Sequence, residues 1–542
     1  MSTMGQDKKI GKRELLDCTL RDGGYVNDWN FGHDQIVEIF KRLVSSGVEY
    51  IEIGFIDERR PFDINRSIFP DTASADRIYA GLDKGNSTVL GMIDYGTCGI
   101  ENISPADESF IDGIRVIFKE HLVDQALEFC GELKKLGYKV FAQMVSVTTY
   151  SDEALKEYAV KCNKIHPYAT SMVDSYGLLD GEHLMHIYRI LDRYLDKNIK
   201  EGFHAHNNFQ LGFSNARTFL SCDTDRDILA DGTLYGMGKS AGNAPIELLM
   251  MYRNEYQGTS YDVDQAIEAI DDVIMDIYRK QYWGYNLFYF LAAEAGCHPN
   301  YIRYFQDKQT LSVSQIRELA HSLKKEKKLL FDEAYARQMY LDYQTVSCDD
   351  SKTIEYLSES LKNKKILLMG PGRNVIRQKK KVLSFVNGYD PVIVAVNYIP
   401  SYVTPDYIFL TNSRRYTELM NSQNDIEKCD AKIIATSNVT KTDGKFDYFV
   451  RYESVIDKDT EIFDNSLVML LKLLEKIGVS DIALAGFDGY SKRADNYFDV
   501  SREYSFAKEK ADYLNGYVRK FIGGLESMKT EFVTDSKYET IK

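Results

Sequence analysis

Short apolar, β-branched runs alternate with amphipathic stretches from residue 14 to about residue 256. This alternation is typical of βα units arranged around a parallel sheet. The runs that read as strands are residues 14–20, 50–55, 88–93, 113–118, 139–147, 170–174, 199–206 and 227–234. Eight strands in about 240 residues is the size of a (β/α)8 barrel, so we predict a TIM barrel at residues 13–260.

The 542 residues exceed what one hydrophobic core normally supports, which favours a second domain. Residues 261–345 have helical periodicity and are interpreted as a helical extension of the barrel. The polar, charged residues 346–364 are predicted to form a linker. Strand and helix patterns then alternate again over residues 365–525, which predicts a Rossmann-like α/β domain with an open, mainly parallel sheet.

The composition excludes several classes of partner and location. A formal charge of −14 disfavours binding to a nucleic-acid backbone or to an anionic membrane surface. The sequence has no apolar run long enough to span a membrane or to act as an export signal, so we expect a cytoplasmic protein. Its eight cysteines form no C-x-x-C pair, which fits reduced thiols.

The aromatic-rich residues 282–290 are typical of a core or a subunit interface, and a homo-oligomer is expected.

Two histidines and an aspartate follow predicted barrel strands, where TIM barrels carry their chemistry. His204 and His206 stand two positions apart at a strand end, so both side chains face the same side. Asp22 follows the first strand, and Asn243 follows the last and could add a carbonyl oxygen. We therefore predict a metal site. Mixed nitrogen and oxygen ligands without sulfur favour Mn²⁺ or Mg²⁺ over a closed zinc site.

The chemistry of such a site would suit a 2-oxo acid. The acid could chelate the metal through its carboxylate and keto oxygens, and the metal would stabilise an enolate as a Lewis acid. Arg21 precedes Asp22 and can hold the developing oxyanion with its charged, fork-shaped group. An internal ion pair from Arg21 to Asp22 or Glu52 is an alternative that does not exclude this role.

Three motifs resemble those of the DRE-TIM metallolyase superfamily: DCTLRDGG at 17–24, HAHN at 204–207 and GKSAGNAP at 238–245. Within the superfamily, residues of about 13–345 are most similar to 4-hydroxy-2-oxovalerate aldolase-like proteins. The resemblance implies a divalent-metal site, an enolate-stabilising arginine, substrate contacts and a supporting or acid/base carboxylate. The residues in these roles would be Asp22, His204, His206 and Asn243 at the metal, Arg21 at the enolate, Ser175 and Asn207 at the substrate, and Glu52 as the carboxylate.

The sequence departs from this family pattern at Tyr25. The pyruvate aldolases have a histidine base three residues after the metal aspartate, where this chain has a tyrosine. Cleavage of an aldol needs a group to take the hydroxyl proton, and an ordinary phenol with a pKa near 10 is a poor base at neutral pH. Tyr25 could serve if a cation lowered its pKa, metal-bound water or Glu52 could replace it, or Tyr25 could be a packing residue.

In the second domain, a strand and a glycine-bearing turn precede a helix at residues 365–374. This geometry can present backbone N–H groups to phosphate, so Gly370, Gly372 and Arg373 are candidate nucleotide or anion ligands. The alternative is a structural turn that uses glycine for its sharpness. This half faintly resembles sialyltransferase-like and motility-associated glycosyltransferase-type domains, which would imply a role in glycan or nucleotide-sugar metabolism.

Three functions are compatible with these features. The first is a metal-dependent aldolase that makes or breaks a C–C bond beside a 2-oxo acid through a pyruvate enolate, with an aldehyde as the other substrate. The second is an acetyl-CoA-dependent Claisen condensation of the isopropylmalate synthase type. The third is a scaffold or binding protein whose barrel has lost activity through the tyrosine at position 25.

Overall fold

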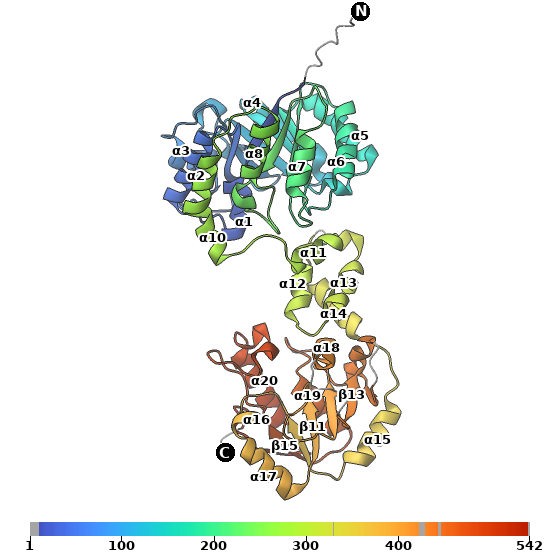
Figure 1. Cartoon of the computed structure of the whole chain (residues 1–542). Coiled ribbons are helices and arrows are strands. Elements are labelled where there is room, and N and C mark those ends of the chain that lie inside the picture. The colour runs from blue at the N-terminus through green and yellow to red at the C-terminus, as the bar shows by residue number, and fades with distance from the viewer. Residues whose placement is uncertain (1–9, 329, 422–428, 443–445, 540–542) are drawn as a thin grey trace, which may run out of the picture. The chain divides into compact units, whose positions relative to one another are not determined.

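The computed structural model describes residues 10–328, 330–421, 429–442 and 446–539. The chain forms two compact units, residues 1–299 and residues 300–542 (Figure 1). Each unit has its own sheet and its own buried apolar core.

The first unit is a closed barrel of parallel strands. Strand β1 pairs with β9 on one side and with β2 on the other, which closes the barrel, while β3 (Ile68–Phe69) adds only to the edge of β2. This confirms the predicted eight-stranded barrel. Its strands are β1 (Arg13–Asp17), β2 (Tyr50–Ile56), β4 (Thr88–Asp94), β5 (Gly113–Phe118), β6 (Lys139–Met144), β7 (Ala169–Asp174), β8 (Lys200–Ala205) and β9 (Ile228–Gly232).

Amphipathic helices surround the barrel strands (Figure 1). In α2 (His33–Ser46), the residues Ile36, Ile39, Phe40 and Leu43 are buried, and their spacing defines one apolar stripe that packs on the barrel. The short α1 (Gly24–Asn27) follows the first strand. The other barrel helices are α3 (Thr72–Tyr79), α4 (Val123–Lys135), α5 (Asp152–Ile165), α6 (Gly181–Tyr194), α7 (Gly212–Leu220) and α8 (Ile246–Tyr256).

The helical segment after the barrel is divided between the two units. Helix α9 (Val263–Ala269) packs against α2, and α10 (Met275–Lys280) and α11 (Leu287–Glu294) follow in the first unit. Helices α13 (Val313–His321) and α14 (Glu333–Gln344) belong to the second unit. Gln315 of α13 donates a hydrogen bond to the Ser413 hydroxyl at 2.9 Å, and Gln344 of α14 donates one to the Tyr452 hydroxyl at 3.1 Å. The boundary at residue 299 thus lies inside the segment 261–345 that the sequence analysis assigned to the barrel.

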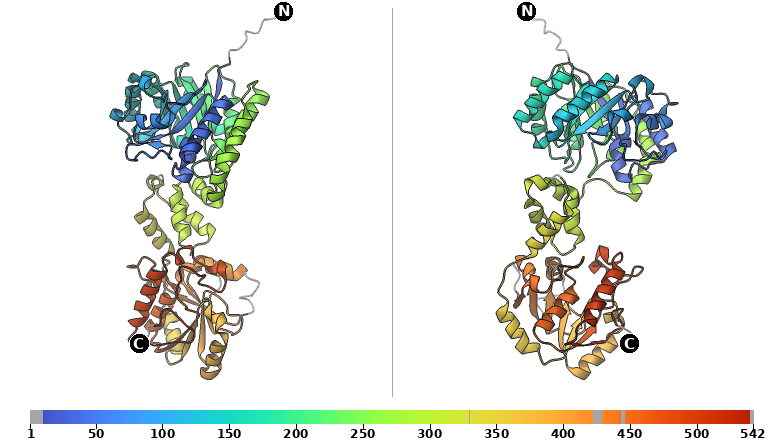
Figure 2. Two further views of the ribbon diagram at one scale, coloured as in Figure 1. Left: turned by 90° about the vertical axis from the view of Figure 1, so that its left-hand side faces the viewer. Right: turned by 180° about the vertical axis from the view of Figure 1, so that it is seen from behind.

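The second unit has an open, fully parallel sheet in the order β14-β13-β12-β11-β10-β15-β16, flanked by helices (Figure 2). This confirms the predicted open α/β sheet. The strands are β10 (Ile366–Met369), β11 (Val392–Val396), β12 (Tyr407–Leu410), β13 (Lys432–Thr436), β14 (Tyr448–Val450), β15 (Asp481–Ala485) and β16 (Lys529–Phe532). The helices include α12 (Pro299–Asp307), α15 (Ser351–Leu361), α16 (Asn374–Arg377), α17 (Lys379–Tyr389), α18 (Ser413–Asn421), α19 (Ser466–Lys476) and α20 (Ala511–Gly523).

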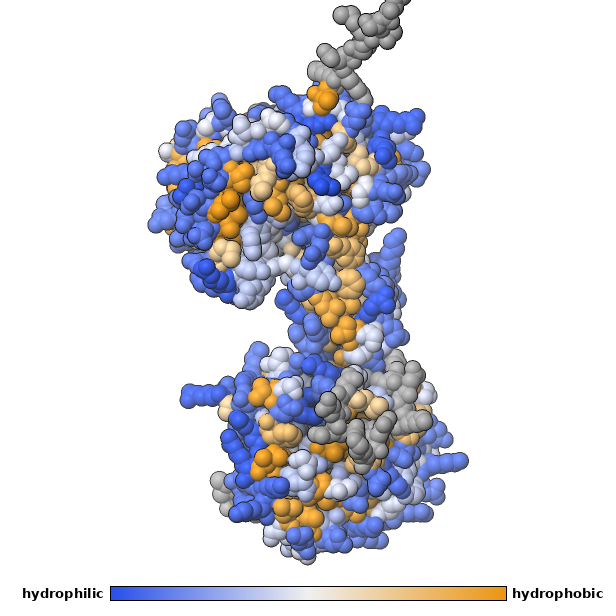
Figure 3. Space-filling model, in the orientation of Figure 1, coloured by the Kyte–Doolittle hydropathy of each residue, from blue (hydrophilic) through white to orange (hydrophobic). Residues whose placement is uncertain are grey.

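The surface carries mostly hydrophilic residues, and apolar side chains also reach it over α11 (Figure 3). In the aromatic-rich segment 282–290, Tyr282, Tyr285 and Leu287 are exposed. None of the helices described in this structure is both long and apolar enough to cross a membrane.

Candidate metal centre and substrate pocket

A pocket of about 450 Å³, its open mouth included, lies at the carboxyl ends of the barrel strands. This is the end of a TIM barrel at which active sites are found. The structure brings most of the predicted site residues to this pocket. Its polar lining consists of Arg21, Asp22, Tyr25, Gln143, Ser175, His204, His206 and Lys239.

The predicted ligands Asp22, His204 and His206 form one buried cluster. Their ligand atoms all lie within 4.8 Å of one another, and the two imidazole rings are 5.0 Å apart. A buried π-helical turn at Thr19–Gly23 follows β1 and carries Asp22 towards the histidines. The alternation of β8 directs His204 to the same side as His206, as the His-x-His spacing predicts. The three residues can therefore hold one metal ion.

The protonation states of this cluster also suit a cation. Burial raises the pKa of the Asp22 carboxyl, but the positive charge of Arg21 and contributions from His206 and His204 outweigh it and hold the pKa well below its ordinary value. Burial lowers the pKa of His206 to about 3 in spite of the nearby Asp22. At neutral pH the site thus offers a carboxylate and a neutral imidazole, the forms that bind metal.

Asn243 lies against the cluster and hydrogen-bonds to Asp22. Its Nδ2 donates to Asp22 Oδ2 at 2.5 Å, which orients the carboxylate. Its Oδ1 and the Nδ1 of His206 are both buried, and neither has a hydrogen-bond partner among the described residues. Buried polar atoms without partners are uncommon and need an explanation such as an unseen ion or water. The donor set therefore fits a divalent cation held by Asp22, His204 and His206, with Asn243 as a further oxygen ligand.

A second layer of charged residues supports His204. Its Nδ1 lies 2.9 Å from Asp231 Oδ2, which leaves the other ring nitrogen for a metal. Asp231 is held in turn by Arg115 Nη2 at 2.5 Å, and the same nitrogen donates to Gln143 Oε1 at 2.9 Å. Sequence reasoning did not identify these residues. The sequence does carry a signal for two of them, because Arg115 in β5 and Asp231 in β9 are each the one charged residue of an otherwise apolar strand.

Arg21 is held by two carboxylates, Glu52 on β2 and its neighbour Asp22 in the turn after β1. Its Nε donates to Glu52 Oε2 at 2.7 Å, and its Nη1 donates to Asp22 Oδ1 at 2.6 Å. Arg115 Nη1 contacts the same Glu52 oxygen at 3.2 Å. Glu52 is fully buried beneath the pocket and is not among the residues that line it. The ion pairs anticipated for Arg21 are present, and its side chain still faces the pocket.

The two predicted substrate contacts have different environments. Ser175 lines the pocket, and its Oγ accepts a hydrogen bond from the backbone N–H of Ser146 at 2.7 Å. Asn207 does not line the pocket. Its Oδ1 instead accepts a hydrogen bond from the backbone N–H of Gly212 at 3.0 Å, which closes the loop before α7. Asn207 therefore shapes the loop beside His206 in this structure.

Tyr25 lines the pocket within an aromatic group. Its ring lies 4.9 Å from that of Trp29 and 5.9 Å from that of Phe55, and its hydroxyl has no hydrogen-bond partner among the described residues. Although 40 % of the residue is exposed, burial of the phenol and then the charge of Asp22 raise its pKa above the ordinary value. The phenol is thus protonated at neutral pH and is suited to donate a hydrogen bond.

The glycine-rich loop after β9 approaches the metal cluster closely. The backbone N–H of Lys239 is 3.3 Å from Asp22 Oδ2, and the Lys239 ammonium lies 5.3 Å from the centre of the Tyr25 ring. Sequence reasoning placed Lys239 in a motif without giving it a role. Its charge adds a cation to the pocket wall beside Tyr25.

We expect Gly238→Ala to disrupt the metal site, because a Cβ at Gly238 would lie only 2.6 Å from Asp22 Oδ2 and would also overlap the Asn243 amide. Metal content of the purified variant should fall well below that of the parent. Gly81→Ala is the matched control, since a Cβ there meets nothing within 4 Å. Full metal content in Gly238→Ala would contradict the close approach described here.

In the second unit, the predicted anion ligands lie in a turn whose N–H groups are already paired. The N–H groups of Gly370 and Gly372 donate to the carbonyls of Ala485 and Gly486, each at 2.8 Å, and Asn374 N donates to Asp488 Oδ2 at 2.7 Å. A Cβ on Gly370 would lie 2.7 Å from the Gly486 oxygen. Arg373 lies 4.0 Å from Asp495. The glycines are thus required for close packing of two loops, and anion binding at this turn stays a prediction.

The first unit is defined by its fold and site as a TIM barrel with a candidate metal centre at its catalytic end. Residues 12–274 match the model of the HMGL-like family, so this unit contains an HMGL-like domain. The matched residues end at 274, and this assignment covers the first unit only.

Several curated proteins are similar to the same half of the chain. The 4-hydroxy-2-oxovalerate aldolase of Moorella thermoacetica is 25% identical over 270 residues, which covers 49% of this chain and 78% of the relative. The same enzyme from Chloroflexus aggregans is 28% identical over 239 residues, covering 43% and 67%. The oxaloacetate decarboxylase of Mycobacterium tuberculosis is 26% identical over 260 residues, covering 47% and 74%. The first unit thus has distant aldolase homologues.

Proposed function

We propose that the first unit is a divalent-metal-dependent aldolase that makes or cleaves a C–C bond beside a 2-oxo acid. The main support is the presence of Arg21 in the same pocket as the Asp22, His204 and His206 cluster. A cation held by the cluster would stabilise negative charge, as the guanidinium does, and the enolate of pyruvate carries such charge on its oxygen. The names of the aldolase relatives agree with this reaction class.

The bound cation would supply a Lewis acid for the keto oxygen of the substrate. The chain itself supplies the rest of the environment. Arg21, fixed by Glu52 and Asp22, presents a permanently charged group to the developing oxyanion without reorganisation. Ser175 lies on the pocket wall and can hydrogen-bond the substrate. Asp231 holds the His204 ring in place.

Tyr25 acts in this proposal as a hydrogen-bond donor to the aldehyde oxygen. Its phenol faces the pocket, is protonated and has no competing partner among the described residues. It is therefore suited to protonate the alkoxide that forms when pyruvate adds to an aldehyde. In the cleavage direction the same group would have to accept the proton, which its raised pKa opposes.

A second candidate reaction follows from this difficulty at Tyr25. Decarboxylation of a 2-oxo acid with a carboxylate on C3, such as oxaloacetate, breaks the C3–C4 bond and leaves its electron pair in a pyruvate enolate. Carbon dioxide departs, and the enolate carbon then takes a proton, so no group has to remove a hydroxyl proton. The similarity to an oxaloacetate decarboxylase also favours this candidate.

An assay for pyruvate release tests the proposal. The purified chain with Mn²⁺ should release pyruvate from a 4-hydroxy-2-oxo acid, from oxaloacetate, or from both, measured through coupled NADH oxidation by lactate dehydrogenase. Free CoA should not appear when acetyl-CoA is supplied with a 2-oxo acid. CoA release without any pyruvate chemistry would support the Claisen reaction instead. No turnover of any of these substrates by metal-loaded protein would support the scaffold.

Tyr25→Phe should separate the two candidate reactions. It removes only the hydroxyl, so the addition of pyruvate to an aldehyde, the direction in which Tyr25 donates its proton, is expected to slow by about 100-fold or more, the usual contribution of an acid–base group. Decarboxylation should change by no more than a few-fold. The variant should keep its metal content, because the Tyr25 hydroxyl contacts none of the predicted ligands. Equal losses in both reactions would show that Tyr25 acts through packing.

A further inference from the structure

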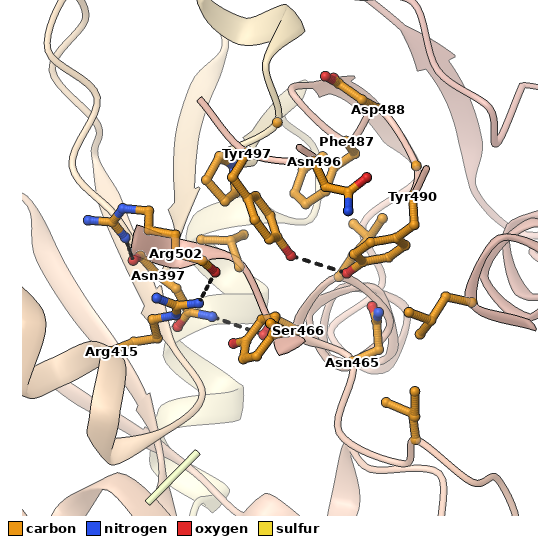
Figure 4. Close-up of a pocket in the computed structure, with 18 of the residues that line it drawn as sticks. Asn397, Arg415, Asn465, Ser466, Phe487, Asp488, Tyr490, Asn496, Tyr497 and Arg502 are labelled. Carbon is orange, nitrogen blue, oxygen red and sulfur yellow. Dashed lines mark hydrogen bonds between the residues drawn. The ribbon is translucent and has the colours of Figure 1, made fainter. Parts of the chain in front are cut away.

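The second unit contains a cavity of about 950 Å³, its open mouth included, that is separate from the barrel site (Figure 4). It lies at the carboxyl edge of the parallel sheet. Loops that follow β10, β11, β12 and β15 contribute Gly372, Asn397, Asn412 and Phe487 to its lining.

The strand order places this cavity where ligands bind in open α/β sheets. From β10 the chain proceeds outward through β11, β12, β13 and β14, and then returns to place β15 on the other side of β10. The gap between β10 and β15 is therefore the topological switch point, and crevices at such points are the usual ligand sites. Because the backbone N–H groups of the β10 loop are already paired, recognition of an anion must come from side chains.

Arg502 provides unused donors at the cavity. Its Nη1 donates to the Asn397 carbonyl at 3.0 Å, but its Nε is buried without a hydrogen-bond partner, and the nearest carboxylate oxygen, on Asp499, is 3.5 Å away. Arg415 lies beside it and donates to the Arg502 carbonyl at 2.6 Å. Burial and then the charge of Arg415 lower the pKa of Arg502. Arg415 is paired with Glu418 at 2.6 Å, so Arg502 is the incompletely neutralised one of the two guanidinium groups (Figure 4).

Lys308 adds a second cation to the lining. Its ammonium has no hydrogen bond and no carboxylate oxygen within 4.0 Å among the described residues, and it lies 4.6 Å from the centre of the Tyr304 ring. Burial lowers its pKa, although the more distant Asp464 opposes this shift. The carboxyl groups of Asp464 and Asp488 also line the cavity, and burial raises the pKa of both. The two cations with free donors, Lys308 and Arg502, therefore favour an anionic ligand.

Aromatic rings and amides line the rest of the cavity. Tyr490 and Tyr497, whose hydroxyls are 3.3 Å apart, stand across from the arginines (Figure 4). The amide oxygens of Asn412 and Asn465 accept bonds from backbone N–H groups, whereas their Nδ2 atoms have no acceptor among the described residues. Aromatic faces can pack on a planar ring, and free amide donors can bind its edge.

We propose that this cavity binds a nucleoside phosphate, with the phosphate at Arg502 and Lys308 and the base among the tyrosines and asparagines. Inorganic phosphate would contact the cations but not the aromatic rings and amides. An apolar ligand would leave the two cations without a partner. The turn that the sequence indicated contributes Gly372 to the wall of this cavity, but the ligand groups proposed here are side chains of other loops, with the cations at residues 308 and 502. It does not depend on the reaction at the barrel.

Isothermal titration of the full chain with CMP, UMP, AMP and GMP tests the proposal. At least one nucleotide should bind at least tenfold more tightly than inorganic phosphate and than its own nucleoside. Arg502→Gln and Lys308→Met should each weaken that binding at least tenfold. Arg493→Gln is the matched control, since Arg493 is exposed, makes no side-chain hydrogen bond, and is not among the cavity-lining residues. The nucleotide affinity of Arg493→Gln should equal that of the unsubstituted protein.

Three results would overturn the proposal. These are no binding of any of the four nucleotides at millimolar concentration, inorganic phosphate binding as tightly as the best nucleotide, or parental affinity in both Arg502→Gln and Lys308→Met. Thermal denaturation of each variant shows whether it is folded. If Arg502→Gln is unfolded, the affinity of Lys308→Met decides, because the Lys308 side chain makes no hydrogen bond whose loss would destabilise the fold.

Discussion

His206→Ala is expected to lower metal affinity by roughly 100-fold or more and to abolish pyruvate release. The imidazole is buried, neutral and within 4.8 Å of the other ligand atoms, so its loss removes one of three protein ligands that no neighbour can replace. Even changes to residues that only support a metal ligand cost about 10- to 100-fold in affinity. Metal content after dialysis and the coupled pyruvate assay measure the two effects.

His183→Ala is the matched control for this substitution. The side chain of His183 is 74 % exposed on α6, does not line the barrel pocket, and among the described residues pairs with Asp180. Its loss should leave metal content and turnover unchanged. If His206→Ala retained full metal content and full activity, the assignment of Asp22, His204 and His206 as the metal centre would be wrong.

Arg115→Met should destabilise the first unit by about 3–5 kcal/mol, the usual cost of removing one partner of a buried ion pair. Arg115 is fully buried and contacts Glu52 at 3.2 Å and Asp231 at 2.5 Å, so the methionine would leave two buried carboxylates without their shared cation. Chemical denaturation monitored by circular dichroism measures the loss. Because Asp231 orients His204 and Glu52 orients Arg21, catalytic activity should fall as well.

Arg42→Met serves as the control for the ion-pair argument. Arg42 pairs with Glu38 at 2.7 Å on the surface of α2, where solvent screening leaves an ion pair with little net effect on stability. A double variant, Arg115→Met with Asp231→Asn, should recover part of the lost stability, because Arg115 is the one arginine paired with Asp231 among the described residues, whereas Glu52 keeps its ion pair with Arg21. Equal stability losses in Arg115→Met and Arg42→Met would contradict the role given to the buried network.

Local sequence patterns were sufficient to predict the barrel and to bring together the residues of its candidate metal centre. Strand alternation depends on nearby residues, so the apolar runs located all eight barrel strands. The period of two in a strand also predicted that His204 and His206 share a face. Asp22 could be added because the first and last strands of a closed barrel are neighbours, as the pairing of β1 with β9 confirms.

Side-chain direction outside regular strands was less predictable. Asn207 directly follows a ligand in the sequence, but the backbone has left β8 there and the side chain binds the next loop instead of the pocket. The sequence offered Arg21 as a partner of Glu52, but the second partner, Arg115, comes from β5 and was not predicted. The helices of residues 261–345 also carry no local signal of which sheet they join.

The sequence by itself determined the barrel, the open second sheet and the type of residue at the metal centre, because strand periodicity and strand-end motifs are local properties. Only the tertiary structure decided which charges support these residues. It showed that Arg115 links Glu52 to Asp231, and that Arg502 and Lys308 face one cavity. Such contacts join residues far apart in the chain, and their energies depend on burial and distance, which one sequence does not contain.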